Sequence, residues 1–320
     1  MRIKLPKATQ VGIGGGISFI SNFRKAINPF GHQIVEEGDY DLLFISGATL
    51  CDRETYQHAK DNNKFIILRV DNILEDSKNR NTGMPRMEEF AKDCDVVVYQ
   101  SEWAKKLLTP HCGEGQVIYN GIDTDIFYPS KKEKDWEGIR IFYSKYGRGE
   151  GKNFNVVQYF FREYCLERDD ATLVIAGRFA DDIQKINHPF EFHQDEDFQY
   201  LGVVSDPARL AEIMRTCDVA LLPYFSDACS NTVLEAQACG LPVIYDYSGG
   251  TPEIVEYGEM LDGRIPRDLQ VQIAIGQKKK YFEQHGFEYW KEEYGLEKMG
   301  REYHKVFEIL SKGQQDRIEE

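Results

Sequence analysis

Short apolar runs rich in β-branched residues alternate along this chain with segments of helical periodicity, and this alternation limits the fold to few classes. Runs that are apolar on both faces and separated by helices are typical of parallel strands in an α/β protein. In the first half they are DLLFIS (41–46), KFIILRV (64–70), DVVVY (95–99) and QVIY (116–119). In the second half they are IRIFY (139–143), TLVIA (172–176), FQYLGVV (198–204), VALLP (219–223) and PVIY (242–245).

The length of 320 residues is enough for about two domains. A polar, charged stretch, PSKKEKDWEG (129–138), is typical of a linker. We therefore expect two Rossmann-like, doubly wound parallel-sheet domains facing a cleft, over residues 1–130 and 131–285. A helical segment over 286–320 should pack back on the N-terminal domain. Ligands of such sheets bind beyond the carboxyl ends of the strands, so the loops after the strands should carry the site.

Charge and cysteine content exclude several functional classes. The net charge of -14 argues against a general nucleic-acid-binding surface, because phosphate backbones are held by clustered Lys and Arg. It also predicts at most peripheral membrane contact. The seven cysteines form no CxxC pair and indicate reduced thiols, and MRIKLPKATQ lacks the apolar core of a signal peptide. We therefore expect a cytoplasmic protein.

The most informative stretch is PYFSDACSNTVLEAQACGLPVIYDYSGGTPEIVEYG, residues 223–258. A helix should begin there with Ser230 or Asn231 as its N-cap, and a helix N-terminus favours an anion such as a diphosphate. Glu235 lies about one turn into this helix, where its carboxylate can accept hydrogen bonds from a ribose diol. Asp227, in the preceding loop, can reach the other end of the same ligand. The alternative is an ordinary capped helix with a solvated Asp.

A glycine-containing basic loop, SKYGRGEGKNF (144–154), directly follows the strand predicted at 139–143. Its cations Lys145, Arg148 and Lys152 suit a diphosphate leaving group, whose negative charge grows as the sugar departs. A solvated basic turn is the alternative interpretation.

A glycine pair precedes the last short helical pattern of the same region. The backbone N–H groups of Gly249 and Gly250, with Glu253 just beyond, can bind sugar hydroxyls or phosphate. A plain turn followed by a first-turn Glu has the same pattern.

SNTVLEAQACGLPVI followed by GGTPEIVEYG resembles the donor-site signature of the family 4 retaining glycosyltransferases, which have the GT-B fold. In that family two acids eight positions apart, normally both Glu, hold the donor. The second acid binds the nucleotide ribose and corresponds to Glu235, and the first contacts the donor sugar and corresponds to the shorter Asp227. Lys152 matches the family's phosphate-binding Lys, with Arg148 or, alternatively, Lys145 as its Arg partner. VIYNGIDTDIFYP (117–129) resembles the segment that leads into the family's interdomain linker.

The resemblance implies a metal-independent enzyme that moves a sugar from a nucleotide-diphosphate donor to an acceptor hydroxyl with retention of anomeric configuration. No further cofactor is implied, and the acceptor is a sugar, a lipid-linked molecule, a protein or a nucleic-acid base. The alternatives are a nucleotide-sugar epimerase of the same fold and a nucleotide-sugar-binding protein with weak catalysis. A nicotinamide dehydrogenase is a more distant alternative.

The first half carries a glycine loop that runs into a helix, GIGGGISFISNFRKA (12–26). In the resembled family this loop lies near the donor phosphate and the acceptor. Gly14, Gly15 and Gly16 are therefore candidate ligand-binding residues, and a plain tight turn is the alternative.

Relatives in the resembled family often carry a His after the strand that corresponds to 64–70. This chain instead has Arg69, Asp71 and Asn72. Asp71 should lie at the carboxyl end of its strand, where Arg69 can keep it ionised for a catalytic contact with acceptor or donor sugar. The alternative is a strand-end Asp that caps a turn and pairs with Arg69 for structure.

Asp-x-Asp pairs are the one sequence pattern that could hold a metal diphosphate. In an acidic chain such pairs arise by chance, and the seven His residues show no ligand spacing, so we predict no metal at the site. The pairs are Asp39/Asp41, Asp93/Asp95, Asp123/Asp125 and Asp195/Asp197.

Overall fold

The computed structural model describes residues 1–6, 14–71, 83–132, 134–145, 152–168, 170–178 and 198–319. These residues form two compact units, one made of Met1–Gly121 with Tyr294–Glu320 and the other of Ile122–Glu293. This division differs from the boundaries predicted at 130/131 and 285/286. The stretch 129–138, predicted as a linker, is attached to the second unit. There the indole Nε1 of Trp136 donates to Asp218 at 3.0 Å.

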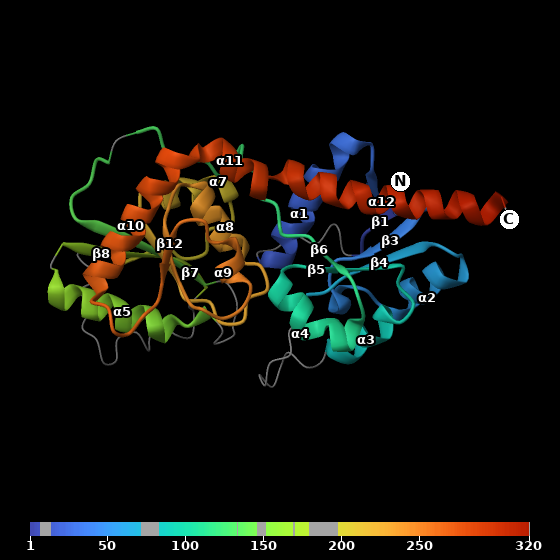
Figure 1. Cartoon of the computed structure of the whole chain (residues 1–320), viewed down its shortest axis with the longest axis horizontal. Coiled ribbons are helices and arrows are strands. Elements are labelled where there is room, and N and C mark those ends of the chain that lie inside the picture. The colour runs from blue at the N-terminus through green and yellow to red at the C-terminus, as the bar shows by residue number, and fades with distance from the viewer. Residues whose placement is uncertain are drawn as a thin grey trace. The chain divides into compact units, whose positions relative to one another are not determined.

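The first unit contains a parallel sheet (Figure 1). Its strand order is β2-β1-β3-β4-β5-β6. Its strands are β1 (Arg2–Lys4), β2 (Gln33–Val35), β3 (Leu42–Ile45), β4 (Phe65–Arg69), β5 (Val96–Tyr99) and β6 (Gln116–Val117). Its helices are α1 (Gly15–Ile27), η1 (Asn28–Phe30), η2 (Ala48–Leu50), α2 (Arg53–Asp61), α3 (Met84–Ala91), α4 (Glu102–Cys112) and α12 (Leu296–Glu319).

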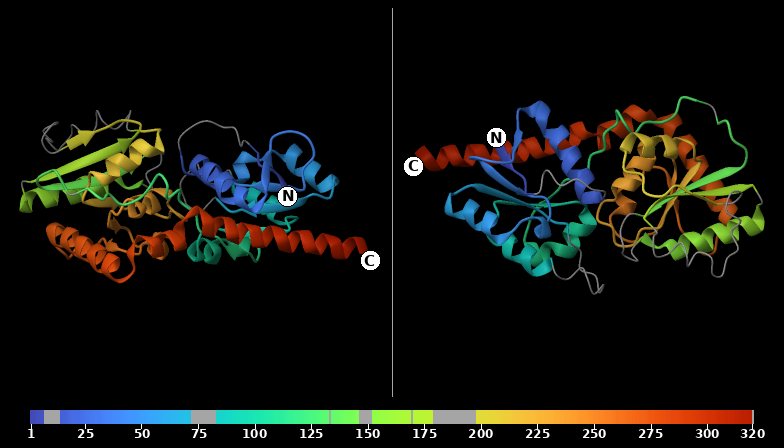
Figure 2. Two further views of the ribbon diagram at one scale, coloured as in Figure 1. Left: turned by 90° about the horizontal axis from the view of Figure 1, so that it is seen from above. Right: turned by 180° about the vertical axis from the view of Figure 1, so that it is seen from behind.

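Helices cover both faces of this first sheet, because successive side chains of a strand point to opposite faces. In β3, Leu42 and Phe44 pack into a core with α1 and α12, whereas Leu43 and Ile45 pack into a second core with α2, α3 and α4. The C-terminal helix α12 thus completes the N-terminal unit, where it packs against α1 (Figures 1 and 2).

The second unit repeats this architecture with a parallel sheet of strand order β12-β11-β10-β7-β8-β9. Its strands are β7 (Ile139–Lys145), β8 (Ala171–Gly177), β9 (Phe198–Tyr200), β10 (Val219–Leu222), β11 (Val243–Tyr245) and β12 (Gly258–Met260). Its helices are α5 (Phe154–Glu167), α7 (Pro207–Arg215), α8 (Asn231–Ala238), α9 (Thr251–Ile254) and α10 (Arg267–Gln284), and α11 (Gly286–Tyr294) reaches the boundary between the units.

Every apolar run predicted as a strand contains one, so the predicted α/β class with two doubly wound parallel sheets is confirmed. The strands β1, β2 and β12 were not predicted. Each has only three residues, RIK, QIV and GEM, and such short segments show no hydrophobic period.

Two further predictions concern the state of the cysteines and contact with a membrane. All seven cysteines are free thiols in the structure. Among the described residues, no helix is both long enough and apolar enough to cross a membrane.

Candidate active site at the edge of the second sheet

Described residues that follow β7, β10 and β11 lie together, because these strands are parallel neighbours in the second sheet and their carboxyl ends share one edge. The loop after β7 carries Lys152, the loop after β10 carries Asp227, and the loop after β11 carries Gly249 and Gly250. The sheet order thus brings together residues that are up to about a hundred positions apart in the sequence.

Helix α8 begins directly after the loop that carries Asp227. Ser230 is its N-cap, and the Ser230 hydroxyl accepts a hydrogen bond from the N–H of Val233 at 3.4 Å, as the capping pattern predicts. Asn231 is the first helical residue and is buried. Glu235 follows one turn later and is 8% exposed. The cap, the helix N-terminus and this acid therefore lie on one short element.

Lys152 forms an ion pair with Asp227, with 2.7 Å between Nζ and Oδ2. The two side chains are 28% and 26% exposed, so the pair is partly accessible to a ligand. The Lys152 ammonium also lies over the ring of Tyr224, 3.5 Å from the ring centroid. The predicted cation and the first predicted acid are thus in direct contact.

Burial raises the pKa of Glu235 to about 7, and the positive charge of Lys152 acts in the opposite direction. Lys152 is therefore electrostatically coupled to both acids. Titratable groups with strongly shifted pKa values gather at functional sites, which supports a ligand-binding role for this cluster.

The glycine pair after β11 braces the Asp227 loop. Gly249 has φ +79°, and a side chain there would lie 2.5 Å from the carbonyl oxygen of Asp227, so only glycine fits. The N–H of Gly250 was expected to bind a ligand but donates to the Asp227 carbonyl at 2.8 Å. This contact gives Gly250 a structural role, because an N–H bonded to a carbonyl is not offered to a ligand. Glu253, a residue of α9, donates its N–H to the carbonyl of Gly250.

Of the other two predicted cations, Lys145 and Arg148, the structure describes only Lys145. Lys145 is the last residue of β7, is 9% exposed, and pairs in register with Gly177 of β8. Its carbonyl accepts a hydrogen bond from the N–H of Arg178 at 2.7 Å. Arg148 lies outside the described residues.

The glycine loop of the first unit ends in a conformation that requires glycine. Gly14 is the N-cap of α1 with φ 147°, and its carbonyl accepts hydrogen bonds from Ile17 and Ser18. Among the described residues, no atom lies within 4 Å of a Cβ added at Gly14, Gly15 or Gly16. Close packing within this part of the chain therefore does not account for these glycines.

Asp71 lies just past the carboxyl end of β4, as predicted. Its Oδ1 accepts a hydrogen bond from the N–H of Ala48 at 3.2 Å, and its carboxylate lies against Gly47, where an added Cβ would collide with Oδ2. Asp71 thus caps the short η2 turn after β3, which agrees with a structural contribution. Asn72 lies outside the described residues.

Arg69 is 4% exposed and donates to the Ser46 carbonyl and to the side-chain oxygens of Gln100 and Asn120. Its guanidinium carbon lies 3.7 Å from the centroid of the Phe19 ring. It therefore joins α1 to the ends of several strands of the first sheet.

The Asp-x-Asp pairs are engaged in local structure where the structure describes them. Asp39 pairs with Lys64 and Asp93 with Lys60. Three further members accept a backbone N–H: Asp41 from Arg2, Asp95 from Ile66 and Asp123 from Asp125. Asp195 and Asp197 lie outside the described residues, and within the described ranges no three His, Cys, Asp or Glu side chains are grouped to hold a metal ion.

Part of the second unit is similar to a known protein family. Residues 145–272 match the family model described as Glycosyl transferases group 1. The matched segment is less than half of the chain and lies within the second unit. The segment includes Lys152, Asp227 and Glu235, whereas Asp71 and the glycine loop of the first unit precede it.

Similar proteins are known at the level of sequence and of fold. N-acetyl-alpha-D-glucosaminyl L-malate synthase from Bacillus anthracis is 28% identical over 155 residues, which cover 45% of this chain and 38% of that protein. This chain thus matches less than half the length of that relative.

Two solved structures share the GT-B fold with this chain over nearly its whole length. Anabaena HepE in complex with UDP-glucose matches with a TM-score of 0.72 and 14% identity, covering 98% of this chain and 100% of that one. Sucrose-phosphate synthase from Thermosynechococcus elongatus matches with a TM-score of 0.73 and 15% identity, covering 98% and 99%.

Sequence reasoning missed the residues that hold Lys152 in the second unit. Tyr224 supplies the ring beneath the ammonium, and Asn153, at φ 49°, donates to the Pro223 carbonyl at 2.8 Å. The signal in the sequence was an aromatic residue directly after the buried strand VALLP, a pattern that is equally typical of a core residue.

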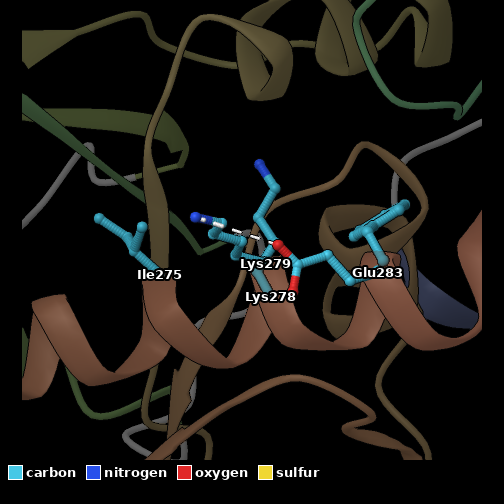
Figure 3. A pocket seen from close by; sticks show the side chains of 5 residues that line it. Ile275, Lys278, Lys279 and Glu283 are labelled. Atoms are coloured by element: carbon cyan, nitrogen blue, oxygen red, sulfur yellow. Dashed lines mark ion pairs between the residues drawn. The ribbon is translucent and has the colours of Figure 1, made fainter.

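A surface hollow of about 440 Å³ lies along α10, beyond the matched segment (Figure 3). It is lined by Ile275, Lys278, Lys279, Phe282 and Glu283, and Lys279 pairs with Glu283 at 4.0 Å. None of the predicted site residues that the structure describes lines this hollow.

Proposed function

We propose that this protein is a glycosyltransferase that moves a sugar from a nucleoside diphosphate donor to an acceptor hydroxyl with retention of anomeric configuration. One observation carries the proposal: the Lys152 ammonium lies 2.7 Å from Asp227 and acts on the buried Glu235, at the carboxyl edge of a parallel sheet. The family match over residues 145–272 supports it, because all three residues lie inside that segment.

In the proposed complex the donor lies along the start of α8. The Glu235 carboxylate accepts hydrogen bonds from the ribose hydroxyls, which requires its ionised form. The diphosphate lies at the helix N-terminus beside Ser230 and Asn231, where the helix dipole favours negative charge. The structural neighbour Anabaena HepE was solved in complex with UDP-glucose, a donor of this chemical class.

In the proposed reaction the bond between the sugar C1 and the diphosphate oxygen breaks. A bond between C1 and the acceptor oxygen forms on the same face, and the proton of the acceptor hydroxyl passes to the departing diphosphate oxygen. Negative charge grows on the departing diphosphate, so a fixed ammonium at Lys152 stabilises the transition state more than the bound donor. Arg148 supplies a second cation in this proposal, and Asp227 contacts the donor sugar.

The proposed enzyme needs no metal, because Lys152, Arg148 and the α8 N-terminus provide the positive charge that a divalent ion supplies in other transferases. Transfer should therefore persist in EDTA. Loss of transfer in EDTA, with recovery on adding magnesium or manganese, contradicts this part of the proposal.

A thermal-shift panel of UDP-, GDP- and ADP-sugars tests the proposal first. A donor present at a hundred times its Kd stabilises the folded state by about 2.7 kcal/mol, which gives a readily measured rise in Tm. Absence of any shift across the panel contradicts donor binding.

Product analysis by NMR, with and without added acceptors, then separates the remaining possibilities. A new glycosidic bond of unchanged anomeric configuration supports the proposal, and an inverted bond contradicts retention. An altered free nucleotide sugar without acceptor identifies an epimerase, and binding without any product identifies a binding protein.

A further inference from the structure

We propose that Tyr224 is a positioning residue that holds the Lys152 ammonium in place for the donor diphosphate. This inference rests on the proposed function, which assigns the diphosphate to Lys152. It adds a residue that the sequence pattern did not single out, and its ring fixes the position of the Lys152 ammonium.

The ring of Tyr224 lies directly beneath the ammonium. Nζ of Lys152 is 3.5 Å from the ring centroid, well within the range of a cation–π contact. Tyr224 is only 1% exposed, so the ring is fixed by its surroundings. Its hydroxyl donates to the carbonyl of Ser144 at 2.7 Å and lies 3.2 Å from the Ser144 hydroxyl. These contacts tie the ring, which follows β10, to the end of the neighbouring β7.

The main chain of Lys152 is held from the same two strands. The hydroxyl of Tyr143, in β7, donates to the Lys152 carbonyl at 2.9 Å. The side chain of Asn153 donates to the Pro223 carbonyl, which directly precedes Tyr224. Both ends of the Lys152 side chain are therefore set by the carboxyl ends of β7 and β10.

An aromatic ring is suited to this task for an electrostatic reason. Asp227 also holds the ammonium, but its negative charge offsets the charge that a diphosphate needs to meet. A ring face attracts a cation without carrying a net charge, so it fixes the position of Lys152 and leaves its full charge for the ligand. When a donor diphosphate takes the place of Asp227 at Nζ, the ring keeps the flexible side chain in position.

NMR of the unliganded protein with 13C-labelled lysine tests the contact itself. A side chain over a ring face is shielded, so the Lys152 ε-protons should resonate upfield of the other lysines, with the signal assigned by its loss in Lys152→Arg. The upfield shift should persist in Tyr224→Phe, which keeps the ring, and vanish in Tyr224→Leu. An unshifted signal in the wild type, or a shift that survives in Tyr224→Leu, overturns the inference whether or not a donor is ever found.

A double-mutant cycle tests whether Tyr224 acts through Lys152. With UDP as the probe in calorimetry and the donor found by the panel in turnover assays, Tyr224→Leu should weaken UDP binding and lower kcat by about tenfold each. Tyr224→Phe should stay within about threefold of wild type for both. In a Lys152→Ala background, Tyr224→Leu should have no further effect, because the group it positions is gone. Additive losses overturn the inference.

Tyr164→Leu is the matched control for general damage to the core. Tyr164 is also 1% exposed, lies in α5 of the same unit, and has no part in the proposed site. It should lower Tm as Tyr224→Leu does while leaving kcat and UDP affinity unchanged. A tenfold loss of kcat in Tyr164→Leu as well would assign the Tyr224 effect to packing and overturn the inference. Failure of the wild type to bind any donor in the panel, with the NMR shift present, contradicts the proposed function and not the contact.

Discussion

The two sheets of this protein each place a cation on an aromatic face at their carboxyl edge. In the first unit the Arg69 guanidinium carbon lies 3.7 Å from the centroid of the Phe19 ring. In the second unit the Lys152 ammonium lies 3.5 Å from the centroid of the Tyr224 ring. The same local contact therefore occurs twice on the same kind of scaffold.

The surroundings of the two cations differ. Arg69 is 4% exposed and donates to oxygens of Ser46, Gln100 and Asn120, so it braces the ends of several strands. The Lys152 side chain is 28% exposed and pairs with a carboxylate, so a ligand can reach it. A buried cation with fixed hydrogen bonds stabilises structure, whereas a partly exposed cation can exchange partners.

Replacing the two cations should give the largest and most different effects. Lys152→Ala should lower kcat by about 10²–10³-fold, the usual loss when one group that stabilises growing negative charge is removed. The donor Michaelis constant should rise less, because the diphosphate carries more charge in the transition state than in the bound donor. Steady-state kinetics with the donor found by the panel measures both constants.

Arg69→Met is the matched variant at the other edge. It should lower the free energy of unfolding by about 1.5–3 kcal/mol, through the loss of hydrogen bonds to a charged group. Denaturant unfolding measures this loss. A fall in kcat of Lys152→Ala no larger than the rise in its Michaelis constant, or an unchanged stability of Arg69→Met, breaks the distinction between the two cations.

Glu235→Ala should give the next largest effect, on binding. Loss of a charged hydrogen-bond acceptor costs about 1.5–3 kcal/mol, which weakens UDP binding by roughly 10- to 150-fold. The fold should stay intact, because removing an acid whose pKa is raised by burial removes a group that is costly to keep charged. Calorimetry measures the affinity and circular dichroism checks the fold. Unchanged affinity for UDP and for the donor contradicts the assigned contact with the ribose.

Much of the fold could be predicted from the sequence, because the buried strands are continuous apolar runs. The period-two arrangement in β3 divides Leu42 and Phe44 from Leu43 and Ile45 and explains why helices cover both faces. The boundary between the units was not predictable from local polarity. The residues 129–138 are polar, yet Trp136 is attached to Asp218, 82 positions later, by a long-range contact.

The candidate site follows from the sequence only in part, for a similar reason. The helix cap at Ser230 and the acid one turn later are local patterns, so they could be predicted. The ring of Tyr224 under Lys152 and the Gly250 contact with Asp227 depend on which strands are neighbours, which the sequence does not state. The structural contact of Gly250 and the position of Tyr224 were therefore not predicted.

Asp71→Asn tests whether the carboxyl edge of the first sheet also contributes to catalysis. The substitution keeps the size and the hydrogen bond with the Ala48 N–H but removes the charge. If Asp71 contacts the acceptor or the donor sugar, transfer should fall at least about tenfold, which corresponds to roughly 1.4 kcal/mol of barrier. UDP affinity, measured by calorimetry, should be unchanged. Near-normal transfer by a stable Asn variant shows that Asp71 only caps the turn after β3.

The smallest expected effect is a pH dependence that arises in the second unit from Glu235. Its pKa is raised from 4.5 to about 7 in the folded protein, so between these values the folded state binds more protons at this site than the unfolded state. The stability that protonated Glu235 contributes is fully present below pH 4.5 and is lost as pH rises through about 7. His32 in the first unit acts in the opposite direction, because burial lowers its pKa from 6.5 to about 4 and stability is lost as pH falls.

Comparison of the wild type with Glu235→Gln isolates the contribution of the acid, because His32 and the phosphates of UDP titrate equally in both. As pH rises from about 4.5 to 7, the unfolding free energy of the wild type should fall relative to that of the variant. The affinity of the wild type for UDP should instead rise with pH relative to the variant. Ribose hydroxyls donate to the ionised carboxylate, and protonation removes that acceptor. The ratio of wild-type to variant affinity for UDP should therefore fall by about threefold to tenfold between pH 8 and pH 6. One pH unit below the pKa, only about a tenth of the Glu235 carboxyl groups remain ionised. A ratio of affinities that stays constant over this range contradicts the contact between the Glu235 carboxylate and the ribose.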